Sequence, residues 1–142
     1  MPHEVILAPV PLVHLESALA IAAGRRVAFS TSQASFPPQW EGRHVFFYAS
    51  ASGYAGGSAD IGKVPFRGVL VRHLPSSSGF YGGDAVRPAS TATDNASLAF
   101  FEVADFEKLA KPLLIGQFAK ADGGKYAAGF TPRRPIASRL PE

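Results

Sequence analysis

The stretches GRRVAFST, residues 24–31, and WEGRHVFFYAS, residues 40–50, decide the fold that this sequence predicts. Their valine, phenylalanine and tyrosine residues favour strands, and glycine or proline residues bound both stretches. The second stretch is apolar at consecutive positions, which is typical of a central strand buried on both faces. A glycine-rich turn, residues 53–57, follows it. This order predicts a small, curved, mostly β unit with a basic corner at Arg25 and Arg26.

A helix is expected before the first of these strands. Leu12, Leu15 and Leu19 recur at helical spacing and define one apolar face. Pro11 suits the first turn of a helix, where its missing N–H needs no partner. Gly24 suits a left-handed cap at the end of the helix.

The remaining pattern adds further short elements. Strands are expected at residues 4–8, 97–103 and 125–130, and residues 59–74 form either two strands or one long strand bent at Pro65. Asp105 is a good N-cap for a second helix, Phe106–Ala110. About six strands with two or more helices are most simply arranged as an α+β, mostly β pseudo-barrel with the helices outside.

Length and composition predict a single domain spanning residues 1–142. The chain is 46% hydrophobic and 18% charged, which is typical of a globular protein. Residues 75–96 are rich in serine, glycine, threonine and aspartate, and they predict a flexible loop that is either a lid over a ligand or a segment tucked into the core. Residues 131–142 contain three prolines and predict an irregular, basic tail.

Several kinds of chemistry have no support in the sequence. The chain has no cysteine, and its four histidines lack the spacing of metal ligands, so we expect no metal site, no catalytic residue set and no cofactor. Residues 57–63 match the start of a phosphate-binding loop, but Val64 replaces the required serine or threonine and a β pattern follows instead of a helix. No membrane span or signal peptide is expected, and a cytoplasmic location is the simplest interpretation.

Charge and aromatic residues indicate a surface for polyanions or bases. The net charge is +3, and the C-terminal part concentrates basic residues such as Lys125, Arg133 and Arg134. Such an excess is typical of a polyanion site, although lysines and arginines that only keep the protein dissolved would give the same composition. Tyr54 and Tyr81 stand among polar residues, as is typical of stacking surfaces for nucleic-acid bases.

The order of motifs from Leu15 to Gly62 resembles the PUA-like superfamily, and within it the ASCH and EVE domains. The resemblance rests on a helix that ends in Gly-Arg-Arg, a strand, the segment Trp-Glu-Gly-Arg, a second apolar strand and the turn that leads to Ala-Asp-Ile-Gly. It covers about a third of the chain. It implies a pseudo-barrel with a cleft between the first helix and the barrel, where related domains bind RNA or a modified nucleobase.

Some members that are similar to ASCH domains hydrolyse an acetylated cytidine nucleoside, using a lysine and, three residues later, a threonine. The matching positions here are Arg26 and Phe29. Arginine stays protonated and phenylalanine has no hydroxyl, so that activity is not carried over. The aspartate that follows the family glycine is also absent, because Arg43 follows Gly42.

The leading hypothesis is a binding module for RNA, single-stranded nucleic acid or a modified nucleobase or nucleoside. A small hydrolase that uses Glu102, Asp60 or His73 is the alternative, and a protein-interaction domain with its cleft filled by side chains is a third. In the leading hypothesis a common cleft contains the following residues, with Lys125, Arg133 and Arg134 steering the polyanion: Arg25, Arg26, Ser30, Tyr48, Ser50, Tyr54 and Tyr81.

Overall fold

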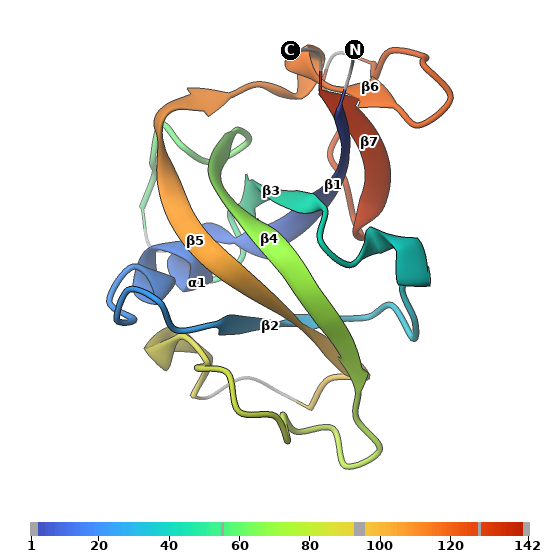
Figure 1. The fold of residues 1–142 in the computed structure, drawn as a ribbon. Coiled ribbons are helices and arrows are strands. Elements are labelled where there is room, and N and C mark those ends of the chain that lie inside the picture. The colour runs from blue at the N-terminus through green and yellow to red at the C-terminus, as the bar shows by residue number, and fades with distance from the viewer. Residues whose placement is uncertain (1–2, 55, 93–95, 128, 141–142) are drawn as a thin grey trace.

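The computed structural model describes residues 3–54, 56–92, 96–127 and 129–140. These residues form one seven-stranded sheet with the strand order β2-β5-β4-β3-β1-β7-β6 (Figure 1). The strands are β1 (His3–Pro11), β2 (Val27–Thr31), β3 (His44–Ser50), β4 (Val64–Pro75), β5 (Ala99–Leu113), β6 (Ala119–Lys120) and β7 (Ile136–Leu140). The helix α1 (Leu12–Ala18) and the short 3-10 turns η1 (Pro38–Trp40), η2 (Ala89–Thr91) and η3 (Ile115–Gln117) lie between them.

The two apolar stretches lie where their patterns predict. β3 pairs in parallel with β1 and antiparallel with β4, so it is an interior strand of the sheet. Its residues alternate between two clusters: Phe47 packs in the main core with α1, while Phe46 packs in a smaller cluster with Phe118 on the other face. The prediction of a central strand covered on both faces is therefore confirmed.

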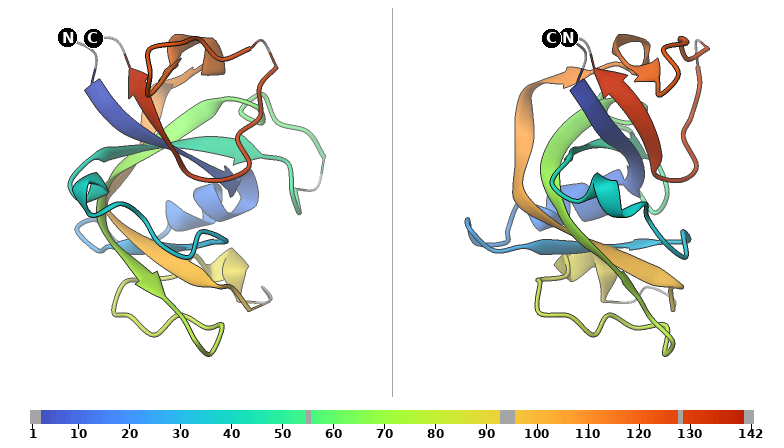
Figure 2. Two further views of the ribbon diagram at one scale, coloured as in Figure 1. Left: turned by 90° about the vertical axis from the view of Figure 1, so that its right-hand side faces the viewer. Right: turned by 45° about the vertical axis from the view of Figure 1, so that its right-hand side comes forward.

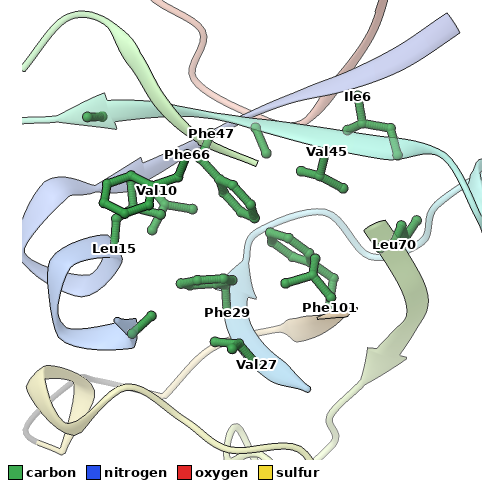
Figure 3. Close-up of a cluster of buried hydrophobic side chains, with 14 of the residues drawn as sticks. Ile6, Val10, Leu15, Val27, Phe29, Val45, Phe47, Phe66, Leu70 and Phe101 are labelled. Carbon is green, nitrogen blue, oxygen red and sulfur yellow. The ribbon is translucent and has the colours of Figure 1, made fainter. Parts of the chain in front are cut away.

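The main core lies between α1 and the concave side of the sheet. Figure 3 shows Phe29, Phe47 and Phe101 turned toward one another, with Leu15 of α1 beside them. The ring centroids of Phe29 and Phe47 are 5.0 Å apart and their planes are tilted, which is a favourable arrangement for aromatic pairs. This cluster fixes the position of α1 and of the segment that follows it.

β4 and β5 form one long curved pair that runs through the height of the molecule (Figure 2). Residues 64–75 are thus a single strand, and no strand precedes Val64 between residues 59 and 63. Three register shifts interrupt the β4–β5 ladder. Such bulges increase local twist and bend the pair, which explains the curvature.

The expected second helix, Phe106–Ala110, is wrong, because these residues continue β5. The ring of Phe106 packs between Phe29, Phe47 and Phe66 at centroid distances of 5.7, 5.5 and 5.2 Å. A helix of five residues has little stability of its own, so burial of this ring in the extended conformation decides the structure.

The expectation of a pseudo-barrel with two or more helices needs correction. The sheet is open: β2 and β6 are its two edges, and the described residues contain one α-helix. Instead of joining β6, β2 is covered along its free edge by a bridge between Val27 and Val86. The structure agrees with the coarser prediction of a mostly β fold. No helix of the described residues has the length and apolar character to cross a membrane.

The C-terminal part also differs from the prediction. The described residues of 125–130 form no strand and contribute only a bridge between Ala119 and Lys125. The expected irregular tail instead contains β7, which pairs with β1 from His3 to Leu7. Pairing with β1 explains this outcome, because it satisfies backbone hydrogen bonds that β1 would otherwise leave open.

Candidate binding cleft beside a β-bulge

A β-bulge in the β4–β5 ladder shapes an open hollow beside the end of α1. Arg67 pairs with Glu107 and Val69 pairs with Ala104, so β5 has one more residue than β4 between these two pairs. Gly68 lies opposite the extra residue, and a Cβ atom there would be 3.1 Å from the Ala104 carbonyl oxygen. Glycine therefore permits the close approach of the two strands.

Asp105 lies in the bulge with a φ of 53°, and it is the one non-glycine residue with positive φ in the described part of the chain. Aspartate tolerates this left-handed conformation better than most residues, at some cost in energy. Residues in sparsely populated backbone conformations cluster at binding and catalytic sites. The bulge thus marks this part of the sheet as a candidate site.

The cleft has a volume of about 470 Å³ and lies between the bulge and residues 18–25, at the end of α1 and in the following turn. This volume is within the range of small-molecule sites. Apolar contributions come from Ile21, Val69 and Phe106. The polar and charged side chains that line it are Arg25, His44, Arg67, Asp105 and Glu107.

The charges of the cleft are mixed and accessible. Arg67 Nη2 is 3.4 Å from Glu107 Oε1, and these side chains are 41% and 52% exposed. An exposed ion pair of this kind is weak, so a ligand can displace or extend it. Arg25 and Asp105 form no ion pair with any described residue. The cleft therefore offers both hydrogen-bond donors and acceptors to a ligand.

The two neighbouring arginines of the predicted site point to different places. Arg25 lines the cleft. Arg26 Nη1 instead lies 3.4 Å from Glu102 Oε1, in a network that also contains Tyr81. Burial of the Tyr81 phenol, together with its hydrogen bond to Glu102, raises the pKa of Tyr81 to about 12. Arg26 and Tyr81 therefore lie near each other but outside the cleft.

The other predicted cleft residues do not join Arg25. Ser30 is half-buried on β2, paired with Phe100. Tyr48 is 8% exposed and packs in the smaller apolar cluster. Ser50 ends β3 opposite Pro11. Tyr54 packs at the edge of the main core, where a hydrogen bond with Glu16 raises its pKa.

The basic residues near the C-terminus lie at the other edge of the sheet. Lys125 is exposed in the loop after β6, and Arg133 and Arg134 are exposed before β7. β6 and β7 are at the opposite end of the strand order from β2, beside which the cleft lies. These residues can contribute to the electrostatic field around the molecule, but they do not line the cleft.

The residues named for a hydrolase are separated and already engaged. Glu102 is fully buried and accepts hydrogen bonds from Arg72, Arg26 and Tyr81. Asp60 Oδ2 is 3.6 Å from Lys108 Nζ, and His73 Nε2 is 2.9 Å from the Gln33 carbonyl oxygen. No three histidine, aspartate or glutamate residues of the described chain gather as metal ligands would.

Sequence reasoning did not place His44, Arg67, Gly68, Asp105 or Glu107 in the cleft that they line. Gly68 within a strand-like run carried the one available signal, because an isolated glycine in a strand suggests a bulge. Asp105 was misleading, since the same residue type caps helices. The register shift that brings these residues together is a property of the paired strands, and the sequence of either strand alone does not show it.

Comparison of the chain with protein-family models, curated proteins and solved structures finds no match. The resemblance to PUA-like domains accordingly rests on the sequence features of residues 15–62.

Proposed function

We propose that this protein is a PUA-like binding domain that holds RNA, or a modified nucleobase or nucleoside, in the cleft between the end of α1 and the bulge. The observation that supports this function best is the open volume of about 470 Å³ with both cationic and anionic side chains on its walls. Its position next to the first helix agrees with the site that the family resemblance implies.

Nucleobase edges present donors and acceptors side by side, and recognition of an unstacked base uses both. In the cleft, Arg67 and Glu107 are a neighbouring donor and acceptor. Asp105 adds an acceptor for exocyclic amino groups, and Arg25 adds a donor for a base edge or a phosphate. Phe106 and Ile21 supply apolar surface for the face of the base.

The same geometry favours a binding module over the two other hypotheses. A protein-interaction domain with a filled cleft would leave no such open volume. The residues named for a hydrolase, Glu102, Asp60 and His73, do not line the cleft.

The experiment titrates the protein with short single-stranded RNA, the same sequence as DNA, and a panel of modified nucleosides, at two salt concentrations. The variants are Asp105→Asn and Arg67→Gln, which remove charge from the cleft. Glu41→Gln is the control, because Glu41 is exposed and lies outside the cleft. Product analysis after incubation with acylated nucleosides tests the hydrolase alternative.

RNA binding through phosphate contacts should weaken as salt is added. For each tenfold rise in salt concentration, the logarithm of the association constant should fall by about 0.7 per phosphate contact with a single strand. We expect binding to be reduced in both cleft variants and unchanged in Glu41→Gln. Absence of binding to every probe at low salt would contradict the proposal, as would equal affinities of the control and the cleft variants.

A further inference from the structure

A second cluster of charged side chains lies on the face of β5 that points away from the main core. Along β5, Phe101 and Val103 face the main core, so Glu102 between them faces the other side. Glu102 is fully buried. Its two oxygens accept hydrogen bonds of 3.1 Å from Nε and Nη2 of Arg72, which is its register partner on β4.

Arg26 and Tyr81 complete the surroundings of the buried carboxylate. Arg26 Nη1 lies 3.4 Å from Glu102 Oε1, and the Tyr81 hydroxyl donates to Oε2. A buried charge needs such partners to be tolerated. Two guanidinium groups therefore share one buried carboxylate. Together, Arg26, Arg72 and Glu102 carry one positive charge in excess.

Asp84 supplies the balancing charge from outside. Its Oδ1 is 3.3 Å from Arg26 Nη2 and 3.8 Å from Arg72 Nη2, so one carboxylate lies within ion-pair distance of both arginines. The Asp84 side chain is 74% exposed, and those of Arg26 and Arg72 are 38% and 42% exposed. Exposed ion pairs such as those of Asp84 contribute little to stability, whereas the buried carboxylate of Glu102 holds both arginine side chains in position.

The loop that carries Asp84 lies at the β2 end of the sheet (Figure 1). A Cβ atom at Gly83 would lie 2.3 Å from the Tyr81 hydroxyl and 2.6 Å from Glu102 Oε2. A residue with a side chain at this position would have to displace these side-chain atoms. The close passage places Asp84, which directly follows Gly83, beside the guanidinium groups of the two arginines.

A hollow of about 250 Å³ adjoins the cluster and shares Tyr81 with it. Phe80, which is 66% exposed, and Phe100 form part of its walls. The Arg87 guanidinium lies 5.0 Å from the centre of the Phe100 ring. Phe100 is 3% exposed, so the exposed ring of Phe80 is the surface of this hollow on which a planar base can stack.

We propose that Arg26 and Arg72 form a phosphate-binding site, which the carboxylate of Asp84 occupies in this structure. Two guanidinium groups that converge on one anion match the oxygens of a phosphate, which can accept from both. Glu102 orients both groups before a ligand arrives. The adjoining aromatic hollow suits a nucleotide base attached to that phosphate.

This site is separate from the cleft, since it uses none of the cleft's polar side chains. Its test therefore uses variants outside the cleft, and failure of one proposal leaves the other standing.

The experiment measures binding of inorganic phosphate, uridine 5′-monophosphate and uridine by calorimetry at constant ionic strength. Asp84→Asn removes the internal anion but keeps the size of the side chain. Asp122→Asn is the matched control, because Asp122 is an exposed loop aspartate that accepts a hydrogen bond from Gly124 N–H, and asparagine can also accept it. The double variant Asp84→Asn/Arg26→Gln removes one arginine, and Asp84→Asn/Arg26→Lys keeps its charge if the former does not fold.

We expect Asp84→Asn to bind phosphate about five-fold or more tightly than the unchanged protein, because a competing ion pair and a repelling charge are removed. The Arg26→Gln change should abolish this gain, and Arg26→Lys should reduce it. Tighter binding of the nucleotide than of phosphate, without binding of uridine, would support a nucleotide phosphate as ligand, and equal binding of both would support free phosphate. An absence of phosphate binding in Asp84→Asn, or an equal gain in Asp122→Asn, would overturn the proposal.

Discussion

Arg72 and Glu102 face each other across the β4–β5 ladder, and two hydrogen bonds of 3.1 Å join the guanidinium group to both carboxylate oxygens. Because Glu102 is fully buried, loss of this partner leaves a charge without its main compensation. We expect Arg72→Leu to lower the free energy of unfolding far more than Arg67→Leu does. Arg67 is a matched control, since its pair with Glu107 is exposed at both ends.

Adding Glu102→Leu to Arg72→Leu should restore part of the lost stability, because an apolar pair leaves no unpaired charge. Chemical denaturation of the two single variants and the double variant checks this. Additive effects in the double variant would contradict the interpretation.

Phe106 provides a test of the extended structure of β5. Its ring packs against Phe29, Phe47 and Phe66, so Phe106→Ala should lower the free energy of unfolding by about 3 kcal/mol. Phe80→Ala is the control, because Phe80 is 66% exposed and its loss should cost less than about 0.5 kcal/mol. Similar midpoints for both variants in urea denaturation would show that Phe106 is not part of the core.

Part of the fold could be predicted from the sequence, and Phe106 shows why the rest could not. The central position of β3 follows from its unbroken apolar run, and Gly24 has the expected left-handed conformation with φ at 85°. α1 nevertheless ends at Ala18, and Gly24 closes the following turn instead of the helix. For residues 106–110, a local capping signal at Asp105 competed with burial of Phe106, and burial was stronger.

The candidate cleft was less accessible to prediction than the strands. Its location beside the first helix could be expected, and Arg25 lines it. Its other charged residues come together through a register shift between β4 and β5. Arg25 and Arg26 are neighbours in sequence, but only Arg25 lines the cleft, because Arg26 is held by Glu102 and Asp84.

Gly68 should be required for the shape of the bulge. In Gly68→Ala the new methyl group would lie 3.1 Å from the Ala104 carbonyl oxygen and 3.3 Å from the Val103 side chain. Because backbone must move to accommodate it, we expect a loss of about 1–3 kcal/mol in stability together with weaker ligand binding in the cleft. Gly116→Ala is the control, since a Cβ atom there meets nothing within 4 Å. Equal thermal unfolding of the two variants would argue against close packing at the bulge.

Asp105 allows backbone strain and ligand binding to be measured separately. With φ at 53°, Asp105→Val should destabilise the protein by about 1–2 kcal/mol relative to Asp105→Gly, because a β-branched residue is disfavoured in this conformation. Asp105→Gly should keep the fold and lose the carboxylate, so its ligand binding should fall without a matching loss of stability. Full binding by a stable Asp105→Gly variant would exclude the carboxylate from ligand recognition.

The raised pKa of Tyr81 predicts that the stability of the protein depends on pH in the alkaline range. Burial and the hydrogen bond to Glu102 raise its pKa from 10.0 to about 12 in the folded protein. A group whose pKa is higher in the folded than in the unfolded state contributes stability that is fully present below the unfolded value. That contribution is lost as the pH rises through the folded value, here between about pH 10 and pH 12.

Tyr81→Phe removes the ionisable hydroxyl, so its free energy of unfolding should decline less steeply over this interval than that of the unchanged protein. Urea denaturation at a series of pH values measures both curves, and Tyr54→Phe gives a comparison at a second phenol with a raised pKa. Parallel curves for the unchanged protein and Tyr81→Phe would mean that the phenol does not hold its proton against Glu102.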